Sequence, residues 1–461
     1  MTFTGRRGFS ACWLTLCWFF SACSSATTTV KQGEQFRHIV IIIQENRSFD
    51  NMFKDFPGAD SASYGQTSKQ KRVPLAPVSL AVNYDIRHSY EDYLAAYDSG
   101  RMDGFEKAKI NRRVVSNHST ALPAYPQFGY VPPDEVAPYW RLANRFGIAD
   151  KLFQSNYDQS FGAHLFLIGA QAKGVINVPN GHPWGCDSPP GSVIRRLPLD
   201  GHYRSPIFPC LNMPTLGEEF NKRAISWAYY APAINNWTDW ISRRRRIGTG
   251  RHQVRFRNGK HIEVGQLWSA YDAIPAIRYG PSWQDNVVSP ETTILSDIKQ
   301  RRLPQVSWVV PDFANSDHSG SHSKTGPAWV SSICDAIGEG PYWKDTAIIV
   351  VWDDSGGWFD HVKPPRFDYE GAGFRVPMIV ASARSKQHYV SHKVREFGSI
   401  LKFVEDNFLL APIAARDAGA DDLADFFSDH GTRLRYERLL PGTAEKRILR
   451  SKPSYIPPDD D

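Results

Sequence analysis

The chain has 461 residues, a formal net charge of +6, 41% hydrophobic residues and 22% charged residues. These values are typical of a globular protein with one large domain or two ordinary ones, and they argue against a disordered chain. The charge is mild for this length, so it favours anionic substrates or surfaces only weakly. One dense basic run, Arg243–Arg246, has no nucleic-acid-binding motif around it, and we expect no nucleic acid partner.

The N-terminus has the order of a secretory signal. Arg6 and Arg7 precede an apolar stretch that is too short to span a bilayer, and small residues and Cys23 follow it. The segment Phe20 to Cys23 resembles a bacterial lipobox, in which Cys23 would be lipidated and attach the protein to a membrane. An ordinary or twin-arginine signal stays open. We predict a signal over residues 1–23, a polar tether over 24–35, and a bacterial protein that is periplasmic, outer-membrane-anchored or secreted.

The first apolar strand of the mature chain ends in polar residues. Ile39 to Ile43 is a short β-branched run, typical of a buried parallel strand. Glu45 and Asn46 follow it and can offer oxygen ligands to a cation. Arg47 suits either a phosphate or a structural pairing with Asp50.

A candidate nucleophile precedes a predicted helix. Phe161 to Ala172 has apolar residues at helical spacing, so Ser160 is at or just before the helix start. One interpretation is an N-cap, since Ser is a favoured cap. The other is a hydroxyl that attacks phosphorus, with the helix N-terminus stabilising the phosphate oxygens. Local sequence alone favours the cap.

Further elements alternate between strand and helix. This alternation predicts an α/β fold with a largely parallel central sheet and helices on both faces. Additional strands are expected at 225–230, 306–310 and 376–380, and helices at 330–337 and 397–408. We expect one catalytic domain over residues 36–440 with an irregular cap insertion at about 180–280, and a C-terminal tail over 441–461.

A second apolar run also ends in carboxylates. Thr346 to Val351 predicts a buried strand, and Asp353 and Asp354 follow it. Ligands bind outside the carboxyl ends of such strands. If this strand neighbours the first one, Glu45, Asn46, Asp353 and Asp354 meet in one crevice that suits a hard divalent cation. His361, behind the glycines that follow, is a candidate contact for an anionic substrate.

Three cysteines belong to the predicted mature domain. Cys186 and Cys210 flank a Pro- and Gly-rich loop, and the predicted export permits a disulfide between them. The alternative is two separate buried thiols. Cys334 follows helical spacing and is expected to be a buried thiol.

The segments around Glu45 to Asp50, Ala149 to Gly169, Asp353 to His361, and Gly373 to Glu405 together resemble a known family. It is the bacterial phosphoesterase family that contains the respiratory-burst-inhibiting acid phosphatases and the phosphatidylcholine-type phospholipases C. The resemblance implies an alkaline-phosphatase-like α/β fold and a divalent metal ion of unknown identity.

By motif position, the resemblance also implies roles for single residues. The metal ligands would be Glu45, Asn46, Ser160, Asp353 and Asp354, with Ser160 as the nucleophile. His88 would contact phosphate, and His318 would polarise the phosphate or protonate the leaving group. A further active-site His often lies upstream of the latter in the acid phosphatases; His252 and His261 are candidates without a convincing motif.

The two branches of the family differ after the strand-end Asp. The run Asp353-Asp354-Ser355-Gly356-Gly357-Trp358 is nearer the acid phosphatase pattern than the phospholipase pattern. The sequence therefore predicts an exported metal-dependent phosphomonoesterase that acts through a phosphoserine. A phospholipase C that releases phosphocholine and a surface lipoprotein that binds without turnover are the alternatives.

Overall fold

The computed structural model describes residues 1, 36–111, 122–157, 159–181, 183–232, 254–255, 261–262, 269–428, 433–440 and 443–450. Gly33–Asp461 cluster as a unit separate from Met1–Gln32, and the fold and the site lie in the larger unit. The predicted signal from residue 2 onward, the tether, Cys23, the Arg243–Arg246 run and His252 lie outside the described residues.

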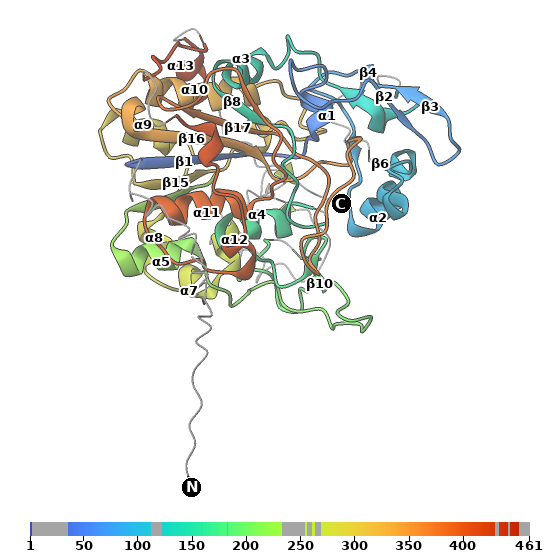
Figure 1. Ribbon diagram of the computed structural model, residues 1–461, viewed down its shortest axis with the longest axis horizontal. Coiled ribbons are helices and arrows are strands. Elements are labelled where there is room, and N and C mark those ends of the chain that lie inside the picture. The colour runs from blue at the N-terminus through green and yellow to red at the C-terminus, as the bar shows by residue number, and fades with distance from the viewer. Residues whose placement is uncertain are drawn as a thin grey trace. The chain divides into compact units, whose positions relative to one another are not determined.

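An eight-stranded sheet forms the centre of the larger unit (Figure 1), in the order β14-β11-β15-β1-β16-β17-β8-β18. β1 (His38–Gln44) and β16 (Thr346–Trp352) are parallel neighbours, with Gln44 opposite Trp352. Both strands therefore end at the same edge of the sheet. The remaining strands are β8 (Gly147–Ala149), β11 (Trp227–Tyr230), β14 (Val287–Val288), β15 (Val306–Val309), β17 (Met378–Ser382) and β18 (Tyr389–Ser391).

The sheet is largely parallel, as predicted, with one reversal. β17 runs antiparallel to β16 and to β8, whereas the other paired strands of the sheet are parallel. β16, β17 and all of β1 after His38 are buried, which explains why their sequences are mostly Ile, Val and Ala without polar alternation. β17 begins two residues later than predicted, after Pro377, which cannot donate a ladder hydrogen bond.

Helices cover both faces of the sheet (Figure 1). One layer contains α3 (Ala137–Arg145), α9 (Thr293–Lys299), α10 (Gly326–Gly338) and α13 (Thr443–Arg450), which contact one another around α10. The other contains α4 (Ser160–Gly169), α5 (Leu216–Arg223) and α11 (Gly398–Asn407). α13 lies within the segment predicted as a tail.

The cap expected over about 180–280 is not one continuous insertion. It is interrupted by α5 and by β11, and β11 lies in the central sheet between β14 and β15. The reason is that all four residues of β11 are buried, so this segment belongs to the core. Within the same region Cys186 and Cys210 form the predicted disulfide, and Cys334 is a buried free thiol on α10.

Shorter elements surround these layers. The two-stranded pairs are β2 (Tyr64–Gln66) with β3 (Arg72–Pro74), β4 (Ala76–Pro77) with β7 (Gly129–Tyr130), β5 (Asp85–Ile86) with β6 (Ile110–Asn111), β9 (Val175–Ile176) with β10 (Arg195–Arg196), and β12 (Val254–Arg255) with β13 (His261–Ile262). The short helices are α1 (Phe49–Met52), α2 (Tyr90–Tyr97), α7 (Pro275–Arg278), α8 (Ser282–Asp285) and α12 (Ala415–Ala418). Single 3₁₀ turns lie at Asp98–Gly100, Phe105–Lys107, Pro126–Phe128, Ala270–Ala273, Phe313–Asn315, Trp343–Asp345 and Ala424–Phe426.

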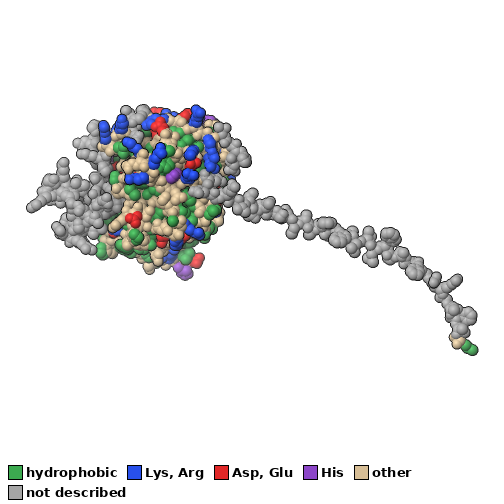
Figure 2. Space-filling model, turned by 90° about the vertical axis from the view of Figure 1, so that its left-hand side faces the viewer, with side chains coloured by type: hydrophobic (Ala, Val, Ile, Leu, Met, Phe, Trp, Pro, Cys, Tyr) green, Lys and Arg blue, Asp and Glu red, His purple; other side chains and the backbone are tan. Residues whose placement is uncertain are grey.

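Among the described residues, none of the helices combines the length and the apolar character needed to cross a membrane. On the face shown in Figure 2, Lys and Arg side chains are spread among Asp, Glu and apolar side chains.

Candidate active site

The polar residues after β1 and β16 meet at the sheet edge. The backbone amide of Asn46 donates to Oδ1 of Asp353 at 3.0 Å, and Nδ2 of Asn46 is 3.4 Å from Oδ2 of Asp354. Glu45, Asn46, Asp353 and Asp354 are all buried. Asn46 has a φ of 55°, a left-handed conformation that Asn tolerates better than most residues. The structure thus brings together the four oxygen-bearing residues that the sequence predicted at one crevice.

Two glycines let the loop after β16 pass close to this crevice. Gly356 and Gly357 have φ of 59° and 70°. A Cβ on Gly356 would lie 2.3 Å from the carbonyl oxygen of Asn46, and one on Gly357 would lie 3.0 Å from that of Arg87. Any larger residue would push the loop away from both segments. This explains why the acidic pair is followed by Gly-Gly.

Ser160 is the first residue of α4 and points at two of the carboxylates. Its Oγ donates to Oδ2 of Asp354 at 3.1 Å and lies 3.4 Å from Oε2 of Glu45. The N-cap position is held by Gln159, whose side chain makes no capping hydrogen bond. Ser160 is therefore not the helix cap, and its hydroxyl lies in the first turn of a ten-residue helix.

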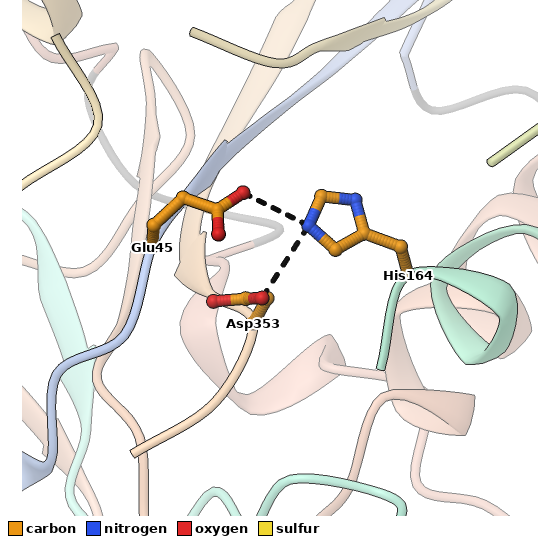
Figure 3. Close-up of side chains that lie close together, drawn as sticks. All are labelled: Glu45, His164 and Asp353. Atoms are coloured by element: carbon orange, nitrogen blue, oxygen red, sulfur yellow. Dashed lines mark hydrogen bonds and ion pairs between the residues drawn. The ribbon is translucent and has the colours of Figure 1, made fainter. Parts of the chain in front are cut away.

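His164 is a member of the site that the sequence reasoning missed. It lies one turn after Ser160 on α4, and its Nε2 is 3.1 Å from Oε1 of Glu45 and 3.4 Å from Oδ2 of Asp353 (Figure 3). Burial alone would lower the pKa of His164, but its hydrogen bonds to Asp353 and Glu45 and the charges of both raise that pKa to about 9. The i, i+4 spacing from the candidate nucleophile was the available signal.

The same contacts keep Asp353 ionised. Burial alone would raise the pKa of its carboxyl group. The hydrogen bond and charge of His164, the amide of Asn46 and the hydroxyl of Ser160 outweigh that effect and hold the pKa below its usual value. Asp353 can therefore offer a charged oxygen to a cation even though it is fully buried.

His88 contacts the crevice from the segment before α2. Its Nδ1 donates to the carbonyl of Ile86 at 2.7 Å, and its Nε2 is 3.0 Å from Nδ2 of Asn46. With the proton on Nδ1, neutral His88 accepts a hydrogen bond from the Asn46 amide at Nε2. This contact fixes the carboxamide so that Oδ1 of Asn46 faces away from His88.

The site residues fit a divalent metal ion. Among the described residues, Oδ1 of Asn46 is a buried oxygen without a hydrogen-bond partner. Glu45, His164 and Asp353 also have ligand atoms close enough to surround one ion. Carboxylate, carboxamide and hydroxyl oxygens suit hard cations, and an imidazole nitrogen nearby also admits transition metals.

Three further candidate histidines, His261, His318 and His361, lie on other segments of the chain. His318 is buried in the loop after β15, where its Nδ1 donates to the carbonyl of Ser319 and its ring lies against Phe313. His361 lies in a separate cluster, with Nδ1 2.7 Å from Asp50 and Nε2 3.0 Å from Asp60. The backbone of His261 lies in β13.

Arg47 does not pair with Asp50, contrary to one of its two interpretations. It is fully buried, and it donates to the carbonyls of Asp317 and Leu80 and to Oδ1 of Asn51. Asp50 contacts Arg375 instead. Arg47 thereby ties the strand end after β1 to the loop that contains His318.

A pocket adjoins the crevice on the side of α2. It is lined by aromatic rings, one cation and several polar groups, and it reaches Asp354. The lining residues include Arg87, His88, Asp92, Tyr93, Tyr157 and Phe374. The pocket is narrow, and it adjoins the crevice at Asp354.

The comparison with protein families decides the family. Residues 36–411 match the model of the phosphoesterase family. The chain belongs to this family. The matched region of this phosphoesterase begins just before β1 and ends just after α11, so it contains the whole sheet and every site residue described above.

Curated relatives carry the names of phospholipases C. The chain is 25% identical to the non-hemolytic phospholipase C of Pseudomonas aeruginosa over 91% of this chain and 61% of the relative. It is 24% identical to phospholipase C B of Mycobacterium tuberculosis over 85% of this chain and 77% of the relative. It is 19% identical to the non-specific phospholipase C3 of Arabidopsis thaliana over 77% of this chain and 64% of the relative. The chain thus spans about three fifths of the length of the Pseudomonas relative.

Among solved structures, a Vibrio parahaemolyticus protein of the alkaline phosphatase superfamily covers 85% of this chain and 70% of its own. Its TM-score is 0.38 and its sequence identity is 9%. This likeness is too weak to add to the family assignment.

Proposed function

We propose that this phosphoesterase is an exported, metal-dependent hydrolase of phosphoric monoesters that acts through a phosphoserine at Ser160. The observation that carries the proposal is the position of Ser160 Oγ, between Asp354 and Glu45 at the N-terminus of α4. A serine hydroxyl is a weak nucleophile unless a neighbouring group takes its proton. Two carboxylate oxygens within 3.4 Å provide that neighbour.

The helix start supplies the second requirement of the reaction. Ser160 is the first residue of α4, so its hydroxyl lies at the positive end of the helix dipole. The N-terminus of a helix favours anions, so the start of α4 suits phosphate oxygens beside Ser160. Stabilisation of the developing charge by such fixed donors accounts for a large part of the catalysis in many enzymes.

A divalent metal, when bound by Glu45, Asn46, Ser160, Asp353 and Asp354, would supply Lewis-acid stabilisation of phosphate charge. The residues themselves orient the ester. Arg87 and His88 line the pocket next to Asp354, so both can contact non-bridging phosphate oxygens. His318 keeps the role implied by resemblance, protonation of the leaving group or polarisation of the phosphate.

The test is a trapping experiment on the purified protein with p-nitrophenyl phosphate. After an acid quench during turnover, we expect one phosphoryl group on the peptide that contains Ser160, found by mass spectrometry. The same assay with p-nitrophenyl phosphorylcholine should be at least about tenfold slower, which corresponds to about 1.4 kcal/mol of transition-state stabilisation. Turnover without a phosphopeptide would contradict the nucleophile, and a faster diester would contradict the monoesterase assignment.

A phospholipase C that releases phosphocholine is the second candidate. The pocket observation favours it, because Tyr93, Tyr157 and Phe374 lie close together and Asp92 is nearby. Aromatic faces with an adjacent carboxylate suit a quaternary ammonium group. The curated relatives are also named phospholipases C. If this candidate is correct, Tyr157→Leu will slow the phosphorylcholine ester while leaving p-nitrophenyl phosphate turnover near the wild-type rate.

A surface lipoprotein that binds without turnover is the third possibility raised by the sequence. The intact Ser160, Glu45-Asn46 and Asp353-Asp354 set speaks against it, because loss of catalysis usually removes such residues. Measurable turnover of either nitrophenyl ester by the purified protein excludes it.

A further inference from the structure

We propose that His164 is a positioning residue that holds Glu45 and Asp353 in the arrangement needed to bind the metal. This inference rests on the proposed function, because it concerns the metal site of that same crevice. It goes beyond it by assigning His164, which is close enough to Glu45 and Asp353 to share an ion with them, a role other than that of a ligand.

The two oxygens of Glu45 have different neighbours. Oε1 is 3.1 Å from Nε2 of His164, while Oε2 is 3.4 Å from Oγ of Ser160. Oε2 is thus the oxygen on the side of the nucleophile, where Oδ2 of Asp354 also lies. His164 engages the other oxygen, which leaves Oε2 available as a ligand.

Asp353 is held in a similar way from two sides. Its Oδ1 accepts from the backbone amide of Asn46 at 3.0 Å, and its Oδ2 is 3.4 Å from Nε2 of His164. One N–H group thus lies between carboxylates from two different strand ends (Figure 3). Both carboxylates and the ring are buried, so bulk solvent does not contact these hydrogen bonds.

The location of His164 on α4 fixes its distances to Glu45 and Asp353. The helix is buried along its whole length, and it also carries Ser160 one turn earlier. A single rigid element therefore sets the distance from the nucleophile to the two carboxylates. Donors that orient metal ligands typically contribute about 10- to 100-fold to metal affinity.

The test compares Mn²⁺ affinity, measured by the electron paramagnetic resonance signal of free Mn²⁺, in the wild type and in variants. His164→Met keeps similar bulk without an N–H, and His164→Asn has a donor too short to reach Glu45. Both should bind Mn²⁺ about 10- to 100-fold more weakly. His164→Gln places an N–H near the position of Nε2 and should restore most of the affinity. His388→Met, at an exposed position, is the matched control and should not change it.

Four outcomes overturn the inference. These are wild-type affinity in His164→Met or His164→Asn, affinity in His164→Gln as low as in His164→Met, nitrogen coupling of a directly bound imidazole in the pulsed spectrum of bound Mn²⁺, and no Mn²⁺ binding by the wild type. Melting of each metal-free variant checks folding, and His164→Asn replaces His164→Met if the latter does not fold. Failure of the proposed function is distinguishable, because it would appear as normal Mn²⁺ binding without ester hydrolysis.

Discussion

Ser160 and His164 lie one turn apart on α4 and point at the same group of carboxylates from β1 and β16. We propose the serine as the nucleophile and the histidine as the residue that positions Glu45 and Asp353. An apolar helix with only two inward polar side chains on one face is expensive to bury unless both are hydrogen-bonded, and both are. This arrangement separates mutations that should stop catalysis from those that should weaken metal binding.

We predict that Ser160→Ala lowers kcat by several orders of magnitude without unfolding the protein. Loss of a nucleophile removes the covalent route, and Ser160 is not the N-cap of α4, so little stability depends on its hydroxyl. Steady-state kinetics with p-nitrophenyl phosphate and thermal melting measure the two effects. Ser399→Ala, a buried serine in the first turn of α11, is the matched control and should keep wild-type turnover. Turnover of Ser160→Ala within about tenfold of wild type would contradict the assignment.

We also predict that Asp353→Ala/Asp354→Ala removes the bound metal. These residues give two of the carboxylates at the crevice, and a site left with Glu45 as its only carboxylate should not hold a hard divalent cation. Elemental analysis of the purified double variant should show metal far below one ion per chain. Ser355→Ala, in the same loop, should retain it. Full occupancy in the double variant would rule out this crevice as the metal site.

At the scale of elements, a second polar cluster connects the segments that carry the ligands. Arg375, just before β17, donates to both oxygens of Asp360 in the loop after β16 and to Asp50 on α1. His361 joins Asp50 to Asp60. The cluster consists of three carboxylates with one guanidinium and one imidazole. It therefore ties the strand ends together as an ion-pair network, with Arg375 occupying the position that a cation would need.

This cluster predicts a pH dependence of stability. Burial alone would lower the pKa of His361, but its hydrogen bond to Asp50 and the charges of Asp50 and Asp360 raise it from 6.5 to about 8. Because the folded pKa lies above the unfolded one, the stabilisation is fully present below about pH 6.5 and is lost as pH rises through about 8. We expect a loss on the order of 1 kcal/mol, allowing for the partial exposure of the ring.

Urea unfolding of the wild type and of His361→Gln at several pH values measures this effect. The variant should be less stable than the wild type at pH 6, and the difference should shrink by pH 9. His388→Gln should show no such change in the difference. A constant gap between wild type and His361→Gln across this range would show that protonation of His361 does not stabilise the fold.

The sequence predicts the features that depend on local patterns, and it does not predict those that depend on tertiary contacts. The β-branched runs of β1 and β16 and the polar residues after them are local patterns, so the crevice could be predicted. The antiparallel direction of β17 could not, because a buried apolar strand has the same composition in either direction. His164 could not be predicted for a similar reason. It lies in an apolar helix, where the sequence does not distinguish a site histidine from a histidine packed in the core. The cluster around His361 depends on Arg375, whose partners are set by the tertiary fold.

At the scale of the whole molecule, a disulfide and two backbone hydrogen bonds connect segments outside the central sheet, within the family region from residue 36 to 411. The disulfide Cys186–Cys210 closes a loop with a sequence separation of 24. The backbone amides of Cys186 and Leu211 donate to the carbonyls of Asp272 and Ala273, in a turn that contacts α4. The bridge therefore braces the surroundings of the nucleophile helix from outside the sheet.

We predict that Cys186→Ser/Cys210→Ser lowers the free energy of unfolding by about 3 kcal/mol, from loop entropy for a closure of this length. Reductant should lower the melting temperature of the wild type to about that of the double variant. It should leave the melting temperature of the double variant unchanged. Cys334→Ala is the control, because that thiol is buried and unbridged on α10, so its loss should not alter the response to reductant. An equal response of the wild type and the double variant would show that the bridge does not stabilise the molecule. Because the braced turn contacts α4, which carries both Ser160 and His164, turnover and Mn²⁺ affinity of the double variant should both fall.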